Sequence, residues 1–411
     1  MTQAVSDMPG GVIRSVASLF VGLALVMVAT GLVGSLVAVR SELEAFPTVA
    51  IGAIMAMYYA GFLVGSLTIP RGLASVGHVR VFTGLASLAA AVALSYPMFP
   101  NAVTWGGLRF VAGVALSGVY VTVESWLNSR SSNATRGRLL SAYALVVTVG
   151  LGVGQMLLGV SDPLGFEPFV LVGILISVAV VPVALVRLPE PSELIPSTVS
   201  LRGLTRIAPL GVVGVAVVGA AGGSIYALGP VFATRAGLDP AGVGTFMAVS
   251  LIAAAVSQYP LGQLSDRFPR RRVILAVSVA AAATAFATAS IGPSGWWLLA
   301  MAGLFGALIF PMYSLSVSHI NDMTPAHDLV PVAAGIMFVF GSASVVGPIV
   351  TSMLMAVVGP AGYFWSVGLL ILPIVVYATV RIIAKAPPPQ EPFIGLPPRS
   401  STGAALLADD D

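Results

Sequence analysis

The chain contains no cysteine, a single lysine and little charge of either sign, since only 9% of its 411 residues are Asp, Glu, Lys or Arg. Without cysteine it forms no disulfide, no thiolate metal site and no cysteine nucleophile. Its one lysine, Lys385, follows no glycine-rich loop, so the chain carries no P-loop ATPase. No clustered His, carboxylate pair or nucleophile and base occurs at helical spacing, so we expect no enzyme, no metal site and no cofactor.

Apolar residues dominate instead, because 57% of the chain is hydrophobic and its mean hydropathy is +0.99. A soluble domain of this length could not bury so much apolar surface, whereas about 20 apolar residues in a helix span a bilayer. The sequence therefore predicts an all-α polytopic membrane protein with twelve transmembrane helices. They are expected at residues 15–38, 47–69, 79–98, 102–127, 138–160, 168–188, 208–233, 241–264, 272–292, 295–320, 329–358 and 361–384.

A polar segment divides the twelve helices into two sets of six. We expect an N-terminal six-helix bundle at residues 1–188, a cytoplasmic linker at 189–207 and a C-terminal six-helix bundle at 208–385. Residues 386–411 are rich in proline and end in three Asp, a composition typical of a disordered cytoplasmic tail.

The positions of the arginines predict the orientation. With the N-terminus inside, 16 of the 19 cations lie in cytoplasmic segments, as the positive-inside rule requires. The other three are Arg40 and Arg235 outside and Arg109 within a helix. We therefore expect a multi-pass protein of the plasma membrane with both termini cytoplasmic. The excess of basic over acidic residues reflects the topology of the chain. We therefore expect no nucleic-acid partner.

The two halves align with each other at an offset of 193 residues, which favours an internal duplication. Transporters built from two such repeats have their substrate route at the interface between the halves. We therefore predict two six-helix bundles related by pseudo-two-fold symmetry. The aligned pairs are Gly113 with Gly306, Tyr120 with Tyr313, Ser125 with Ser318, Asn128 with Asn321 and Gly154 with Gly347.

Several motifs resemble those of the major facilitator superfamily. The segment "YPLGQLSDRFPRRR" at 259–272 is similar to that family's Gly-x-Leu-x-Asp-Arg-x-x-Arg-Arg cytoplasmic loop, while the equivalent loop at 65–80 lacks the Asp. "RFVAG" at 109–113 is similar to the Arg-x-x-x-Gly element of the fourth helix. "ESWLN" at 124–128 and "PMYSLSVSHIND" at 311–322 more narrowly resemble the YcaD-type bacterial branch. The resemblance implies a transporter of the bacterial inner membrane that works by alternating access.

Within the loop at 259–272 we expect a gating role for Gly262, Asp266, Arg267 and Arg271. Asp266 and Arg267 stand where a helix ends at the membrane face, so they can pair with each other, with helix termini or with lipid phosphate. A contact made in one orientation only would bias the conformational equilibrium. The alternative is that these arginines only enforce topology.

Glu124 is an isolated acid at the end of an apolar helix. Helical spacing places it on one stripe with Tyr120 and Asn128, and Arg109 lies about 22 Å away at the outer end. Three interpretations are open: a protonatable coupling site, a cytoplasmic gate that pairs with nearby arginines, or an interfacial anchor.

Other polar residues complete the predicted pathway. Arg109 either contacts an anionic substrate or backbone carbonyls, or organises the outer half of the first bundle. Gln155 and Tyr313 are candidates for lining the cavity, although a Tyr in a membrane helix is as often an interfacial anchor. His319, with Asn321 beside it, is either part of a proton relay or a structural group.

We conclude from the sequence that the chain is a secondary active transporter that moves a small solute, with coupling to protons. The expected partners of the monomer are that solute, protons and membrane lipids. The alternative is a transporter-like membrane sensor that binds a solute without moving it.

Overall fold

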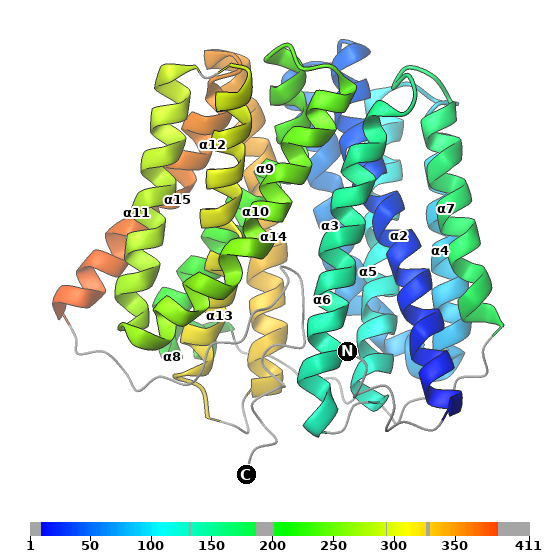
Figure 1. Ribbon diagram of the computed structural model, residues 1–411, viewed down its shortest axis with the longest axis horizontal. Helices are drawn as coiled ribbons and strands as arrows, with labels where there is room; N and C mark the ends of the chain where they lie inside the picture. The colour runs from blue at the N-terminus through cyan, green and yellow to red at the C-terminus, as the bar shows by residue number, and fades with distance from the viewer. Residues whose placement is uncertain (1–9, 131–132, 186–200, 293, 326–328, 385–411) are drawn as a thin grey trace.

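The computed structural model describes residues 10–130, 133–185, 201–292, 294–325 and 329–384, and this part of the chain contains helices and no β-strand. Two groups of helices stand side by side (Figure 1). The first comprises α2 (Gly10–Leu43), α3 (Thr48–Val76), α4 (His78–Ser95), α5 (Ala102–Arg130), α6 (Asn133–Met156), the 3₁₀ turn η1 (Leu157–Gly159) and α7 (Glu167–Ala184). The second comprises α8 (Leu201–Ile207), α9 (Pro209–Arg235), α10 (Pro240–Arg267), α11 (Arg270–Ile291), α12 (Trp296–Ile309), α13 (Pro311–Asn321), α14 (Leu329–Val358) and α15 (Gly362–Ala384).

Twelve spans in the described residues are long and apolar enough to cross a membrane. They match the twelve predicted helices, and the predicted fold class of a polytopic all-α protein is confirmed. The tenth predicted helix is a single span but consists of two helices, α12 and α13. The break falls at Pro311, the first residue of α13, because proline lacks the backbone N–H that a continuous helix needs.

Prolines and glycines also set other helix ends. Pro47 precedes α3, and Pro240 is the first residue of α10, where the Asp239 side chain accepts a hydrogen bond from the Gly242 amide at 2.8 Å. Gly292 ends α11 in the left-handed conformation, with φ of 62°. These residues produce the short turns that make consecutive helices antiparallel.

The helices alternate in direction, so α2 begins and α15 ends on the same side of the molecule, which we call the lower face (Figure 1). Arg40 and Arg235 are in the last turns of α2 and α9 and therefore lie at the opposite, upper face. The start of α11, with Arg270 and Arg271, and the end of α15, with Arg381, lie at the lower face.

The duplication is visible in how the helices pack. A β-carbon on Gly113 would overlap the carbonyl oxygen of Tyr58 in α3, and one on its equivalent Gly306 would overlap the carbonyl oxygen of Ser250 in α10. Gly154 is packed in the same way against α2, as Gly347 is against α9. Each bundle therefore brings the same pairs of helices into backbone contact through equivalent glycines.

The two bundles meet along α2, α3 and α6 on one side and α9, α10 and α14 on the other. Gly52 of α3 lies directly against Ser352 of α14, and Gly244 of α10 lies directly against the backbone of Gln155 in α6. Small residues at these crossings allow helices of different bundles to approach closely.

Parts of the predicted domain organisation lie outside the described residues. These parts are the tail at 386–411 and most of the linker at 189–207. The last residues of that linker form the short helix α8, which contacts α9.

Candidate functional site

The first candidate site is a cavity of about 60 Å³ that is lined mainly by the N-terminal bundle. Arg109 of α5 and Gln155 of α6, both predicted pathway residues, line this cavity together. Tyr226 of α9 lines it from the C-terminal bundle, so the cavity reaches the boundary between the bundles. Its other lining residues include Thr30, Met55, Tyr58, Tyr59, Tyr96, Val172 and Ile176.

Arg109 is buried, with 5% of its surface exposed. One guanidinium nitrogen, Nη2, is 3.3 Å from the sulfur of Met55, and its central carbon is 5.0 Å from the centre of the Tyr58 ring. The Tyr96 hydroxyl is within electrostatic reach of the same group. Among the described residues, no carboxylate lies within ion-pair distance of Arg109.

Gln155 links two helices at this cavity. Its side-chain oxygen accepts a hydrogen bond from the Ser35 hydroxyl of α2, and both side chains are buried. The Gln155 amide is thereby held in one orientation beside the cavity.

A second cavity of about 60 Å³ lies between α6 and α10. Tyr120, a predicted pathway residue, lines it together with Tyr226, which also lines the first cavity. Gln258 of α10 lines this cavity too, and its side-chain nitrogen donates to the Ser314 hydroxyl of α13 at 2.9 Å. The two cavities therefore meet at Tyr226, at the boundary between the bundles.

Glu124 is buried near the lower end of α5, with 4% of its surface exposed. The Tyr143 hydroxyl of α6 donates a hydrogen bond of 2.9 Å to its carboxylate. Tyr313, in the C-terminal bundle, is within electrostatic reach of the same carboxylate. Glu124 therefore joins α5 to α6 and lies in the electrostatic surroundings of Tyr313 in the opposite bundle, although it lines neither cavity.

Two further predicted pathway residues lie apart from both cavities. His319 and Asn321 are buried within α13 near the lower face. Asn128 is part of α5, but its side chain is outside the described residues.

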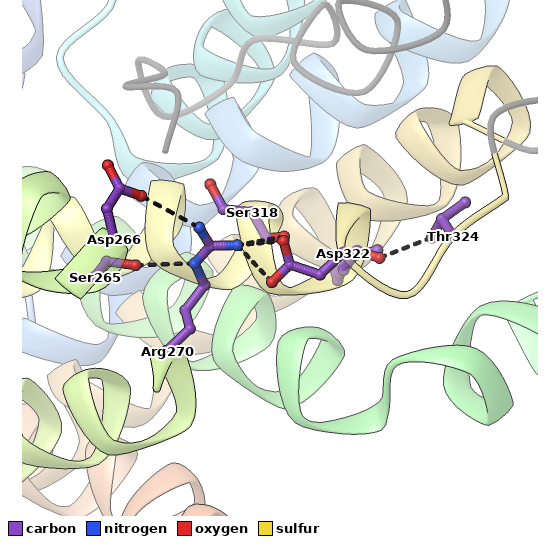
Figure 2. Close-up of polar contacts among 7 residues, drawn as sticks. Ser265, Asp266, Arg270, Ser318, Asp322 and Thr324 are labelled. Atoms are coloured by element: carbon purple, nitrogen blue, oxygen red, sulfur yellow. Dashed lines mark hydrogen bonds and ion pairs between the residues drawn. The ribbon is translucent and has the colours of Figure 1, made fainter. Parts of the chain in front are cut away.

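At the lower face, the predicted gating loop is organised around Arg270 (Figure 2). This buried arginine, at the start of α11, forms an ion pair with Asp322 at the end of α13. It also donates to the Ser265 hydroxyl at 2.8 Å and to the Ser318 carbonyl oxygen at 3.2 Å. Asp266 is 3.7 Å from the other side of the guanidinium and is partly exposed.

The four residues predicted to form the gating loop differ in how far they are exposed. Gly262 and Arg271 are buried, whereas Asp266 and Arg267 are exposed. Sequence reasoning missed the two residues of the buried pair, Arg270 and Asp322. The pair joins positions 52 residues apart, which no local motif reveals.

The pair of Arg270 and Asp322 lies within the C-terminal bundle, whereas at the upper face another ion pair joins the two bundles. Arg235 of α9 contacts both carboxylate oxygens of Glu42 in α2, at 2.7 and 2.8 Å, and the Thr48 hydroxyl of α3 at 2.8 Å. The Arg235 and Glu42 side chains are each about one-fifth exposed. The sequence prediction placed Arg235 outside without assigning it a role.

Known sequences are similar to this chain. Residues 210–406 match the family described as the Major Facilitator Superfamily. The chain is 28% identical over 347 residues to an uncharacterized MFS-type transporter of Yersinia pestis (strain Pestoides F), which covers 83% of this chain and 89% of that protein. An uncharacterized MFS-type transporter YcaD of Escherichia fergusonii matches with the same identity and coverage.

Solved structures share the fold. A bacterial homologue of the human lysosomal transporter Spinster, in an inward-facing and unoccupied conformation, aligns with a TM-score of 0.69 at 15% identity, covering 91% of this chain and 96% of that one. The nucleoside transporter NupG aligns with a TM-score of 0.72 at 12% identity, covering 90% and 98%. The resemblance to the major facilitator superfamily and its YcaD-type branch is thus confirmed. The chain is a multi-pass membrane protein, and these similarities support a membrane transporter.

Proposed function

We propose that this chain is a secondary active transporter that carries a small solute by alternating access between its two bundles. The observation that carries this proposal is the arrangement of the bundle boundary. Both cavities reach this boundary at Tyr226, while the upper ends of the bundles are joined by the ion pair between Glu42 and Arg235.

A pathway between two bundles has to open to each side in turn. The contacts of Arg235 with Glu42 and Thr48 hold the upper ends of α2, α3 and α9 together. They have to break before the cavities can open to the upper face. The pair therefore stabilises only those conformations in which the upper side is closed.

We assign the lower face to the cytoplasmic side of a bacterial inner membrane, with both termini in the cytoplasm. The start of α11 brings three consecutive arginines, Arg270 to Arg272, to this face. At the upper face, Arg40 and Arg235 are each paired with a glutamate. This distribution follows the positive-inside rule. Closure by Glu42 and Arg235 is then closure of the external side.

We further propose that protons drive the transport and that Glu124 is the coupling residue. A buried carboxyl group is the type of residue that binds and releases a proton in transporters. Tyr143 contacts Glu124 from its own bundle and Tyr313 approaches it from the other. Movement of the bundles therefore changes the surroundings of this carboxylate, which is what coupling requires.

The test is solute-dependent proton movement in vesicles that contain the purified protein and an internal pH dye. Pooled metabolites and amphipathic compounds are added to the wild type and to Glu124→Gln. We expect a pH change with the wild type that is lost in the variant while the protein stays folded. Solutes that raise the melting temperature but move no protons and show no flux in either protein would favour the sensor over the transporter.

A further inference from the structure

We propose that the cavity beside Arg109 binds a small organic anion, with one carboxylate paired to Arg109 and an apolar body among the surrounding tyrosines. This inference rests on the proposed transport function, because it names the class of solute for the same pathway. It is carried by the charge of the cavity, the contacts of Arg109 and the nature of the other lining residues.

Arg109 is the one charged residue among the described residues that line the cavity, which include no Asp, Glu or Lys and no second Arg. A positive charge among apolar side chains acts through a low dielectric constant, so its field is weakly screened. The cavity therefore attracts a negative group and repels a cation. A ligand with a single negative charge neutralises the site.

Arg109 has no carboxylate partner among the described residues. Its contacts there are the thioether sulfur of Met55, the aromatic face of Tyr58 and the hydroxyl of Tyr96. Its Nε, which is buried, has no hydrogen-bond partner among the described residues. This donor beside the cavity thus has unused capacity, and a carboxylate accepts several hydrogen bonds at once.

A buried guanidinium without a carboxylate is costly in a membrane protein. Pairing with an anionic ligand would offset that cost, whereas a neutral ligand would not. The same argument explains why the site has an arginine, because its planar fork binds a carboxylate through two parallel hydrogen bonds.

The other lining residues favour an apolar body on the ligand. Val172 and Ile176 provide aliphatic surface, and the rings of Tyr58, Tyr59 and Tyr226 provide aromatic surface. Tyr226 contributes from the opposite bundle, so a ligand that fills the cavity contacts both bundles. Gln155, oriented by Ser35, is a polar group that can position the ligand.

The charge is also confined to one half of the duplicated chain. At the offset of 193 residues, the position equivalent to Arg109 is Ala302, which is buried. The equivalent of Gln155 is Pro348. The C-terminal bundle therefore repeats the fold of the site without its polar groups, as expected when those groups serve a ligand and the glycines serve packing.

The experiment compares carboxylates with their neutral amides, using the full-length protein in detergent and in vesicles. The probes are acetate, hexanoate, benzoate, phenylacetate and indole-3-acetate, each beside its amide, with chloride and sulfate as inorganic anions. Binding is measured by calorimetry and thermal shift. The variants are Arg109→Gln and Arg109→Lys, and Arg80→Gln removes an exposed arginine as the matched control.

We expect at least one carboxylate to bind the wild type about tenfold more tightly than its amide, as the loss of one charged pair implies. Arg109→Gln should abolish that preference, Arg109→Lys should keep part of it, and Arg80→Gln should keep all of it. Equal binding of acids and amides by the wild type overturns the inference even if Arg109→Gln does not fold. The inference is also overturned if no carboxylate binds the wild type, or if chloride and sulfate bind as tightly as the carboxylates. An unchanged preference for acids over amides in a folded Arg109→Gln protein would overturn it as well.

Flux measurements separate this inference from the proposed function. A carboxylate that binds through Arg109 but does not cross the vesicle membrane supports the site and contradicts transport. A neutral or cationic solute that is transported equally by the wild type and Arg109→Gln supports transport and overturns the anion site.

Discussion

Glu42 and Arg235 are equivalent positions of the two halves, 193 residues apart, and they form an ion pair with each other across the bundle boundary. Equivalent residues meet only where the pseudo-two-fold axis passes between them. The first helices of the two halves, α2 and α9, therefore meet at the axis at the upper face. One copy of this position carries an acid and the other a base, so the two halves are joined here by an ion pair.

Removing this pair should favour conformations open at the upper face. We expect Glu42→Gln or Arg235→Gln to shift the population several-fold, because a partly exposed pair contributes up to about 1 kcal/mol. The chain has no cysteine, so Thr30→Cys in the first cavity provides a single label site. Labelling by a membrane-impermeant maleimide from the upper side should become faster.

Two controls make this test specific. Arg40→Gln removes an upper-face ion pair within one bundle, with Glu44, and should leave the labelling rate unchanged. The charge swap Glu42→Arg with Arg235→Glu should restore the slow rate. An unchanged rate in both single variants would show that the pair is not a gate.

The pair between Arg270 and Asp322 should contribute more to stability than the motif residue Asp266. Asp322→Asn leaves a buried arginine without its main partner and should cost about 3–5 kcal/mol. Asp266→Asn should cost less than about 1 kcal/mol, because that carboxylate is partly exposed and 3.7 Å away. Melting temperatures in detergent give the ranking.

If Asp266→Asn destabilises the protein as much as Asp322→Asn, the assignment of the main contact to Asp322 is wrong. Labelling of Thr30→Cys in the Asp266→Asn background then tests the gating role predicted for the loop. No change in accessibility would leave the loop with a role in topology alone.

Glu124→Gln should separate net transport from exchange. A coupling residue is needed to link solute movement to the proton gradient, so the variant should lose accumulation driven by a pH gradient. Exchange of labelled for unlabelled solute needs no net proton movement and should continue. Loss of both activities would favour a gate, and retention of both would favour an anchor.

Gly154 should tolerate a side chain much less well than its neighbour Gly152. A β-carbon at Gly154 would overlap the backbone of α2, whereas Gly152 faces open space. We expect Gly154→Ala to destabilise the protein by about 1–3 kcal/mol through overpacking and Gly152→Ala to have little effect. Equal melting temperatures of the two variants would contradict the close packing of α2 and α6.

The helices could be predicted from the sequence because long apolar runs mark the spans. Equivalent glycines such as Gly113 and Gly306 indicated the duplication, but which helices they bring into backbone contact came from the structure. The break between α12 and α13 was missed because hydropathy continues across it, and only Pro311 indicates it.

The candidate site was predictable in part. Arg109, Gln155 and Glu124 stand out as polar residues in apolar helices, but their partners come from helices whose rotation the sequence does not give. Met55, Tyr58 and Tyr143 are examples. The pair of Glu42 and Arg235 did leave a signal, because the offset that aligns the glycines also aligns these opposite charges.

The most direct test of alternating access measures the upper and lower openings of the same protein under the same conditions. Spin labels on exposed residues report one distance across the upper face, from Asn101 to Ser294, and another across the lower face, from Ser75 to Phe268. When a transported solute or a pH gradient is added, part of the molecules should show a longer distance across the upper face and a shorter distance across the lower face. Distances that stay fixed at both faces, or that lengthen together, would contradict alternating access between the two bundles.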